Sequence, residues 1–326
     1  MSTDSKWRAL FALLATVVLA VGVAACGGDD DDDGGDGGDT SANLIEENTD
    51  NNGVQVTVGS KNFTEQFILG EIYAQALEAA GYEVKTQLNL GSEVIALRAL
   101  EDGEIDAYPE YTSTALTSFF DIAPEDVPAD AQQAEEDTQA EFEELGLTAF
   151  PPTPFSSANA VGLLTEQADE LGASTITDLE GQSEDLTLYG SPECRQRVDC
   201  LVGLEDNYGL QFEKFTPVDI GLRYEVLDKG DADLSILFTT DAQLSTSDKY
   251  TILEDDQGVL PAGNVLFVAR TETVDEAGPD FSEVVESVQG DLSLEVMQEL
   301  NARVDIDKED PAEAAEAYLQ EFGYIE

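Results

Sequence analysis

The order of strand and helix patterns over residues 54–108 constrains the fold of this chain more than any other feature. Valines alternate with polar residues over 54–58, which is the period of a strand with one buried face. A helix pattern follows over 62–80, and strand patterns return at 82–88 and 105–108. This β-α-β-α-β order predicts a parallel sheet with helices on its faces, and such sheets bind ligands at the carboxyl ends of their strands.

The turns before the first two helices carry predicted caps. Asn62 is expected to cap the first helix, and Glu65, three residues on, to complete a capping box. Ser92 is expected to cap the second helix. Both turns lie at the sheet edge where a ligand is expected.

A second α/β cycle follows a proline-rich break at residues 151–154. Strand and helix patterns alternate over 160–253, and most of the remaining chain is helical, with one apolar strand. Because that tail is too poor in strands to be a third domain, we expect it to complete the first lobe. The prediction is an α/β fold with lobe 1 at 54–153 plus 255–326 and lobe 2 at 154–254. Two strands then cross between the lobes as a hinge, and the ligand cleft lies between the lobes.

The start of the chain predicts export and lipid attachment. A basic start precedes an apolar run over 9–25, which ends Val-Ala-Ala before Cys26. Small residues before a cleavage point are typical of a signal peptide, and this site resembles the bacterial lipobox. We therefore expect removal of residues 1–25 and lipidation of Cys26; the alternative is an uncleaved membrane helix, which needs ~20 apolar residues. The acidic, glycine-rich stretch 26–53 is expected to be a disordered tether.

The charge and the cysteine content limit which partners and covalent links the chain can have. The formal net charge is −56 and the chain has no histidine. Nucleic acid is excluded as a partner, because phosphate binding needs clusters of lysine and arginine. Cys194 and Cys200 are expected to form a disulfide in an oxidising exterior; the alternative is two unpaired thiols. No metal site is expected.

Five short segments, in this order, carry a family resemblance. They are Val-Gly-Ser-Lys-Asn-Phe-Thr-Glu-Gln at 58–66, Gly-Glu-Ile-Asp-Ala-Tyr-Pro-Glu-Tyr-Thr-Ser-Thr-Ala-Leu at 103–116, Asp-Ile-Gly-Leu-Arg-Tyr at 219–224, Phe-Thr-Thr-Asp-Ala-Gln-Leu at 238–244 and Leu-Glu-Asp-Asp at 253–256. Together they resemble the glycine betaine/carnitine/choline-binding proteins of osmoprotectant ABC importers, and the likeness spans residues 54–326.

That resemblance implies a fold and a function. It implies a type II periplasmic-binding-protein fold in which tyrosines between the lobes surround the ligand's quaternary ammonium. It also implies a small-molecule ligand, ABC permease subunits as membrane partners and no cofactor. With the lipid anchor, we expect a monomer on the extracytoplasmic face of the cell membrane.

The resemblance further implies a set of ligand contacts. Tyr111 and Tyr224 match cage tyrosines and Thr114 matches a polar contact. Asn159 and Gly263 stand where the family has tyrosines. The same and neighbouring segments contribute the other expected contacts: Asn62, Phe63, Asn264 and Thr240. Arg197 either grips a ligand carboxylate or pairs with one of the many acidic side chains.

The two missing tyrosines weaken the expected cage. A trimethylammonium group donates no hydrogen bond, so aromatic faces stabilise it, by about 0.5–2 kcal/mol per ring when desolvated. Asn159 offers a donor and an acceptor instead, and Gly263 is expected to leave space. We therefore expect weak binding of betaine and choline, with a small cationic or zwitterionic amine as the true ligand. Replacement of Tyr111 by alanine is expected to abolish that binding.

Two other classes of function compete with solute transport. An enzyme is not expected, and no catalytic residue is assigned, because the chain has no histidine, no G-x-S-x-G and no phosphate loop. The many acidic residues leave a glycosidase with a pair of catalytic carboxylates open. Such enzymes commonly bind sugars on tryptophan rings, however, and the chain's one tryptophan, Trp7, lies in the signal peptide. The other alternative is a lipid-anchored sensor for another small polar amine or amino acid that is not coupled to transport.

Overall fold

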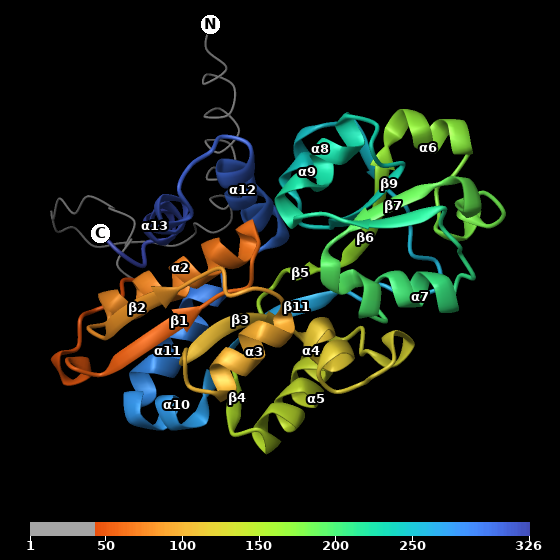
Figure 1. Cartoon of the computed structure of the whole chain (residues 1–326). Coiled ribbons are helices and arrows are strands. Elements are labelled where there is room, and N and C mark those ends of the chain that lie inside the picture. Colours follow the sequence, from red (N-terminus) through yellow and green to blue (C-terminus); the bar gives the residue numbers. More distant parts are fainter. Residues whose placement is uncertain (1–42) are drawn as a thin grey trace, which may run out of the picture. The chain divides into compact units, whose positions relative to one another are not determined.

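The computed structural model of the chain describes residues 43–326 (Figure 1). The predicted signal peptide at 1–25, the lipidation site Cys26 and the tether up to residue 42 lie outside the described residues. Within 43–326, no helix is both long and apolar enough to cross a membrane.

Six strands form the first sheet, in the order β2-β1-β3-β11-β4, with β5 beside β11. Their bounds are β1 Gln55–Gly59, β2 Glu83–Gln87, β3 Ala107–Tyr111, β4 Leu147–Ala149, β5 Ser156–Ser157 and β11 Gly263–Arg270. β1 pairs in parallel with β2 and β3, as the alternating pattern predicts, whereas β11 is antiparallel to β3, β4 and β5. β3 begins and ends later than the predicted strand, so Tyr111 lies at its carboxyl end.

Eight α-helices of the first lobe pack on this sheet or on α2. Their bounds are α2 Thr64–Ala79, α3 Glu93–Glu101, α4 Thr112–Ser118, α5 Ala131–Glu144, α10 Thr271–Ala277, α11 Pro279–Gln289, α12 Leu294–Asp305 and α13 Pro311–Glu321. The sequence predicts three helical stretches after β11, but there are four, because Gly278 at φ 80° separates α10 from α11. α11, α12 and α13 all contact α2, so the helical tail packs on the first lobe.

Five strands form the second sheet, in the order β10-β6-β9-β7-β8. Their bounds are β6 Asn159–Leu164, β7 Thr187–Gly190, β8 Lys214–Pro217, β9 Leu234–Phe238 and β10 Tyr250–Ile252. β7 is parallel to β8 and β9, and β6 is antiparallel to β9 and β10. The helices of this lobe are α6 Thr165–Leu171, α7 Leu201–Asp206, α8 Arg223–Asp228 and α9 Ala242–Thr246, with short 3-10 helices η6 Pro192–Gln196 and η7 Ile220–Leu222.

Two chain segments cross between the sheets, as predicted for a hinge. One runs from β4 through β5 to β6, and the other from β10 to β11. They meet where Ser157 and Ser156 of β5 pair with Gly263 and Asn264 of β11. The exact lobe boundaries stay a prediction, and Val259 and Leu260, just beyond the predicted boundary, pack into the core of the second lobe.

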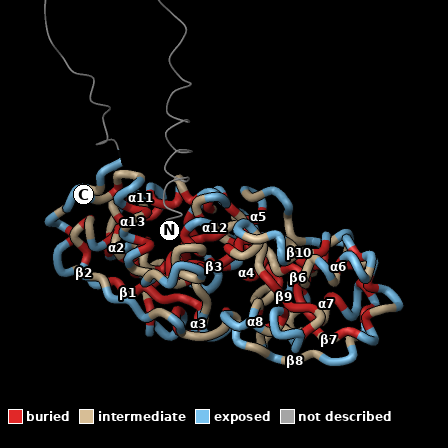
Figure 2. Tube along the Cα trace, turned by 90° about the horizontal axis from the view of Figure 1, so that it is seen from above, coloured by how far each residue is buried: buried red, intermediate tan, exposed pale blue. Residues whose placement is uncertain are grey.

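The core of the first lobe follows the predicted helix face. Leu69, Ile72 and Ala76 of α2 are fully buried and Ala80 nearly so, and Figure 2 shows buried residues along α2 and the central strands of the two sheets. Burying a leucine or isoleucine side chain contributes about 1.5–3 kcal/mol. This burial, rather than helix capping, holds α2 on its sheet.

The predicted cap of α2 is wrong. Phe63, not Asn62, is the N-cap residue, and no side chain caps the helix. Glu65 does not reach back to close a capping box; instead its carboxylate accepts hydrogen bonds from side chains on β3 and α12. Gln66 makes the reach-back contact that was expected of Glu65, since its Oε1 accepts a hydrogen bond from the main-chain N–H of Lys61 at 3.2 Å. Ser92 does stand at the N-cap of α3, but its side chain makes no cap bond.

Order begins before Val54, so the predicted disordered tether does not extend to residue 53. A short 3-10 helix, η2, spans Thr49–Asn51, and Asn51 is buried. Its Nδ2 donates to the carbonyl of Ala80 at 2.9 Å, while the main-chain N–H of Ile45 donates to the carbonyl of Tyr324. These polar contacts to the lobe order a segment whose composition carries little apolar surface.

Candidate functional site

A pocket opens between the two lobes, at the ends of strands from both sheets. Phe63 follows β1, Tyr111 ends β3, Ser191 follows β7 and Phe238 ends β9. This is the edge at which α/β sheets bind ligands. The volume of this pocket is about 70 Å³, on a scale on which one water molecule needs ~10–15 Å³. This volume suits a small solute.

We call this cavity the main pocket. Its lining residues are Lys61, Asn62, Phe63, Ser92, Glu93, Tyr111, Ser113, Thr114, Ser157, Ala158, Asn159, Ser191, Glu193, Cys194, Arg197, Asp199, Cys200, Ile220, Arg223, Ile236, Phe238 and Pro261.

Three aromatic rings line one part of the main pocket. The Phe63 ring centroid lies 6.3 Å from that of Tyr111 and 5.2 Å from that of Phe238. Phe63 and Tyr111 come from the first lobe and Phe238 from the second. The rings therefore form a joint aromatic wall across the lobe interface, where a cation meets negative ring faces.

The chain's own cations already lie over two of these rings. Lys61 Nζ is 4.5 Å from the Tyr111 ring centroid and forms an ion pair with Glu110. Arg223 Cζ is 4.0 Å from the Phe238 ring centroid. Each ring thus has one face occupied by an internal cation, and a ligand cation would have to use the other face.

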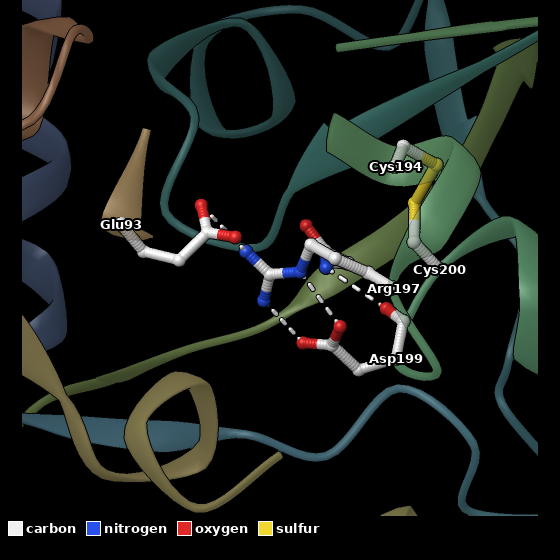
Figure 3. The surroundings of a disulfide bond; sticks show 6 residues. Glu93, Cys194, Arg197, Asp199 and Cys200 are labelled. Atoms are coloured by element: carbon white, nitrogen blue, oxygen red, sulfur yellow. Dashed lines mark hydrogen bonds and ion pairs between the residues drawn. A yellow bond between two sulfur atoms is a disulfide. The ribbon is translucent and has the colours of Figure 1, made fainter. Parts of the chain in front are cut away.

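Arg197 lies between the lobes and is held by acidic side chains (Figure 3). Its Nε donates to Asp199 Oδ1 at 2.7 Å, and its Nη2 also pairs with the Asp199 carboxylate. From the first lobe, Glu93 Oε2 lies 3.6 Å from Nη1, and Thr114 Oγ1 accepts from Nη2 at 3.4 Å. Burial acts to lower the pKa of the guanidinium, but Asp199 and Glu93 raise that pKa above its ordinary value.

A disulfide holds the loop that carries Arg197. Cys194 and Cys200 are joined with an S–S distance of 2.04 Å, and both cysteines line the main pocket. Figure 3 shows the bond beside Arg197 and Asp199. Because the bridge closes over six residues of sequence separation, the two ends of this short loop stay together and keep Arg197 at the lobe interface.

A buried carboxylate supports the Tyr111 ring from behind. The Tyr111 hydroxyl donates to Glu65 Oε1 at 2.6 Å, and Asn301 Nδ2 donates to Glu65 Oε2 at 2.9 Å. Burial raises the pKa of the Glu65 carboxyl, while these hydrogen bonds act to lower it. Burial, with the charge of Glu65, also raises the pKa of Tyr111 well above its ordinary range.

Six of the nine predicted ligand contacts come together in the main pocket. They are Asn62, Phe63, Tyr111, Thr114, Asn159 and Arg197. Asn159 has already committed its donor, because Nδ2 donates to the carbonyl of Asp199 at 2.9 Å.

The other three predicted contacts do not line the main pocket, although Tyr224 and Thr240 line a second pocket beside it. Tyr224 packs edge-on against Tyr250, and its hydroxyl donates to Asp241. Thr240 is buried, with its hydroxyl 3.1 Å from that of Ser157. Asn264 Nδ2 donates to the carbonyls of residues 153 and 155, so this side chain supports the hinge ribbon.

The expectation that Gly263 leaves space is wrong. A Cβ at this position would lie 2.4 Å from Ser113 Oγ and 2.6 Å from Ser113 N. Gly263 therefore allows β11 to approach the start of α4 closely, and Pro261, not Gly263, lines the main pocket on this segment. An aromatic side chain at 263 does not fit this backbone.

Several residues that line the main pocket were not predicted from the sequence. Phe238 ends a predicted strand, so the tendency of α/β sheets to bind ligands at the carboxyl ends of their strands would have predicted it. Glu93 and Asp199 gave no signal, because they are two among 70 acidic residues. Arg223 precedes the predicted contact Tyr224, and only the fold shows that Arg223 is the one that lines the main pocket.

No cofactor or metal is suggested by the pocket's side chains. Among residues 43–326, no group of three or more acidic or cysteine side chains is placed to hold a metal ion. The lining cations Lys61, Arg197 and Arg223 all form ion pairs with carboxylates. The arrangement is thus a binding pocket of aromatic faces and paired charges.

Comparisons with known proteins agree with this geometry. The family model described as the substrate binding domain of an ABC-type glycine betaine transport system matches residues 54–321. A glycine-betaine-binding protein of Pseudomonas aeruginosa is 33% identical over 275 residues, which cover 81% of this chain and 86% of that protein.

Two further proteins extend the comparison. An ergothioneine transport permease/ergothioneine binding protein of Helicobacter pylori is 28% identical over 82% of this chain; the match spans 48%, about half, of that longer protein. The crystal structure of a glycine betaine/carnitine/choline ABC transporter protein superposes with a TM-score of 0.65 at 26% identity, covering 82% of this chain and 99% of that one. By the family match and the 33% identity, the chain belongs to the family of substrate-binding domains of ABC-type glycine betaine transport systems.

Proposed function

We propose that the protein captures a small cationic or zwitterionic amine in the main pocket and delivers it to ABC permease subunits. In this proposal the ligand is an osmoprotectant-like solute, and betaine and choline bind weakly. The protein is a monomer, anchored through a lipid on Cys26 at the extracytoplasmic face, and it catalyses no reaction.

The placement of the chain's own cations supports the weak binding of betaine and choline in this proposal. Lys61 lies over Tyr111 and Arg223 lies over Phe238, so a ligand ammonium competes with an internal charge at both rings. Phe63 is the ring with the weakest internal contact, since Lys61 Nζ is 5.9 Å from its centroid. One largely free ring is worth about 0.5–2 kcal/mol to a cation, far less than a cage of four.

Acidic groups favour a cationic rather than an anionic ligand. Glu93, Glu193 and Asp199 line the main pocket, and Glu65 lies buried behind Tyr111. Since each lining cation is already paired, an anionic ligand would meet no free positive charge in the main pocket apart from one arm of Arg223. A zwitterion meets these acids with its ammonium.

Calorimetry of purified protein tests the proposal. Betaine, choline, carnitine, ergothioneine, proline betaine and ectoine are titrated in turn, and betaine is expected to bind with a Kd weaker than about 1 μM, the value equivalent to −8.2 kcal/mol. Submicromolar binding of betaine would contradict the weak-cage argument. Binding of none of these amines, with anions binding instead, would contradict the ligand class.

Two substitutions distinguish the aromatic wall from a general loss of fold. Phe63→Ala is expected to lower the affinity of whichever amine binds, because its ring is half-buried in the wall. Tyr250→Ala is the matched control, since Tyr250 lies outside the main pocket and donates to Asp228 on the second lobe. Equal effects of the two substitutions would argue against the wall.

Cell fractionation tests the lipid anchor. The unmodified protein is expected in the membrane fraction, because two acyl chains anchor stably, and Cys26→Ala is expected to abolish lipid labelling and processing. A Cys26→Ala product of unchanged size and unchanged membrane association would instead indicate an uncleaved membrane helix.

A further inference from the structure

A second pocket lies between the lobes and shares five lining residues with the main pocket: Asn62, Phe63, Ile220, Arg223 and Phe238. It extends away from the main pocket toward α9 of the second lobe and the end of α12 of the first. These two helices contact one another, and Figure 1 shows α12 beside α9. Its volume is about 210 Å³ by the measure used for the main pocket.

Asn301 on α12 places an unpaired acceptor at this pocket. Its side-chain nitrogen donates to Glu65 Oε2 at 2.9 Å and to the carbonyl of Thr240 at 3.1 Å. Rotating the amide would set its oxygen against both acceptors, so the orientation is fixed by these contacts. Asn301 is 4% exposed, and among the described residues no donor reaches its Oδ1.

Two further buried polar atoms at this pocket are unpaired. Arg223 uses Nε on the carbonyl of Ile220 and Nη2 on Asp241 Oδ1, but no acceptor within 43–326 reaches its Nη1. Gln243 on α9 has a buried Oε1 that no described donor reaches. An unmet buried polar atom costs about 1–3 kcal/mol, so three around one pocket point to a ligand that pairs them.

The charges at this pocket favour a ligand ammonium. Three carboxylates, Glu65, Asp241 and Asp305, line it against two cations, Arg223 and Lys308. Among the described residues neither Glu65 nor Asp305 forms an ion pair with a lysine or arginine. Burial raises the pKa of each carboxyl above its ordinary value. A cation nearby would stabilise the ionised forms.

We propose that the second pocket binds a small α-amino-acid-like zwitterion that carries N–H groups. Its ammonium donates to Asn301 Oδ1 and Gln243 Oε1, and its carboxylate accepts from Arg223 Nη1. A trimethylated ammonium has no N–H to donate and would leave both amide oxygens unpaired. The second pocket therefore selects amines that carry N–H groups. The aromatic wall of the main pocket does not require such groups.

Glycine and glycine betaine are the matched probes, because they differ in three methyl groups in place of three N–H hydrogens. In calorimetry of the purified protein, glycine is expected to bind with the same affinity whether or not betaine is present in excess. N-methylglycine keeps two N–H donors for the two amide oxygens, so affinity at this site is expected to fall mainly at N,N-dimethylglycine, which keeps one, and at betaine, which keeps none. Competition between glycine and betaine would place glycine in the main pocket and overturn the inference.

Gln243→Leu tests the site without touching the main pocket. It is expected to weaken glycine binding about tenfold or more, since a hydrogen bond from a charged donor is lost, and to leave betaine binding unchanged. Gln298→Leu is the control, because Gln298 on α12 donates to the carbonyl of Thr239 and lines neither pocket. Unchanged glycine affinity in Gln243→Leu, or no glycine binding to the unmodified protein, would overturn the inference. Either result leaves the proposed function of the main pocket standing, because that function is read from betaine and the other main-pocket amines.

Discussion

Gly263→Ala is expected to destabilise the protein through the hinge ribbon. The new Cβ would lie 2.4 Å from Ser113 Oγ, 2.6 Å from Ser113 N and 3.0 Å from Ser113 Cβ. The hydroxyl can rotate away, but the main-chain nitrogen belongs to α4 and can yield only if β11 and the helix separate. Overpacking of this kind costs about 1–3 kcal/mol, and the lower chain entropy of alanine returns roughly 0.5–1 kcal/mol. The net expected loss is about 0–2.5 kcal/mol, with its midpoint near 1 kcal/mol.

Urea unfolding followed by far-UV circular dichroism measures this loss. Gly221→Ala is the control, because nothing lies within 4 Å of its Cβ position and its φ is not in the left-handed region; it should stay within about 0.5 kcal/mol of the unmodified protein. If Gly263→Ala is as stable as the control, then the close approach of β11 to Ser113 is not a constraint. In that case the steric reason given above for excluding an aromatic side chain at 263 would fail.

Three further predictions concern the site and its supports. Asn159→Tyr adds one ring to the main pocket, so betaine should bind about 2–30-fold more tightly by calorimetry, the equivalent of about 0.5–2 kcal/mol; unchanged affinity would show that position 159 is no cage position. Burial raises the folded-state pKa of Glu65 above its ordinary 4.5, so the carboxyl favours folding below that value and this contribution is lost as pH rises through the raised pKa. The melting temperature of Glu65→Gln minus that of the unmodified protein should therefore increase from about pH 4 to about pH 8, and a difference independent of pH would contradict the burial argument. Replacing both Cys194 and Cys200 by alanine should cost about 2 kcal/mol in urea unfolding; a reductant should lower the stability of the unmodified protein alone, and equal sensitivity of both proteins would contradict this.

Periodicity and motif order were sufficient for the architecture. The parallel β1-β2 and β1-β3 pairs follow from the strand patterns at 54–58, 82–88 and 105–108. The two-lobed α/β fold, the family and the role as the binding component of an ABC importer are confirmed. The comparisons support transport rather than the alternative of an uncoupled sensor.

Local capping could not be predicted, because a tertiary contact outcompetes the local one. Glu65 at the third position after Asn62 fits a capping box, yet its carboxylate accepts from Tyr111 and from Asn301, 236 residues away along the chain. Two charge-assisted hydrogen bonds in a buried site are stronger than one exposed cap. The same limit applies at Tyr224, which packs on Tyr250 and lines the second pocket, while its neighbour Arg223 lines the main pocket.

Charge pairing, rather than charge count, determines what the main pocket can select. A formal charge of −56 suggests a strong preference for cations, but the local balance is set by the carboxylates that hold Lys61 and Arg197. A ligand carboxylate that approaches either cation must exchange with an internal carboxylate that already accepts from it, and such an exchange gains little net free energy. The ligand's ammonium likewise gains little at rings that an internal cation already covers. The remaining contribution is burial of apolar ligand surface, at about 25 cal/mol per Å², so selectivity among amines in the main pocket follows their shape and methylene content more than their charge.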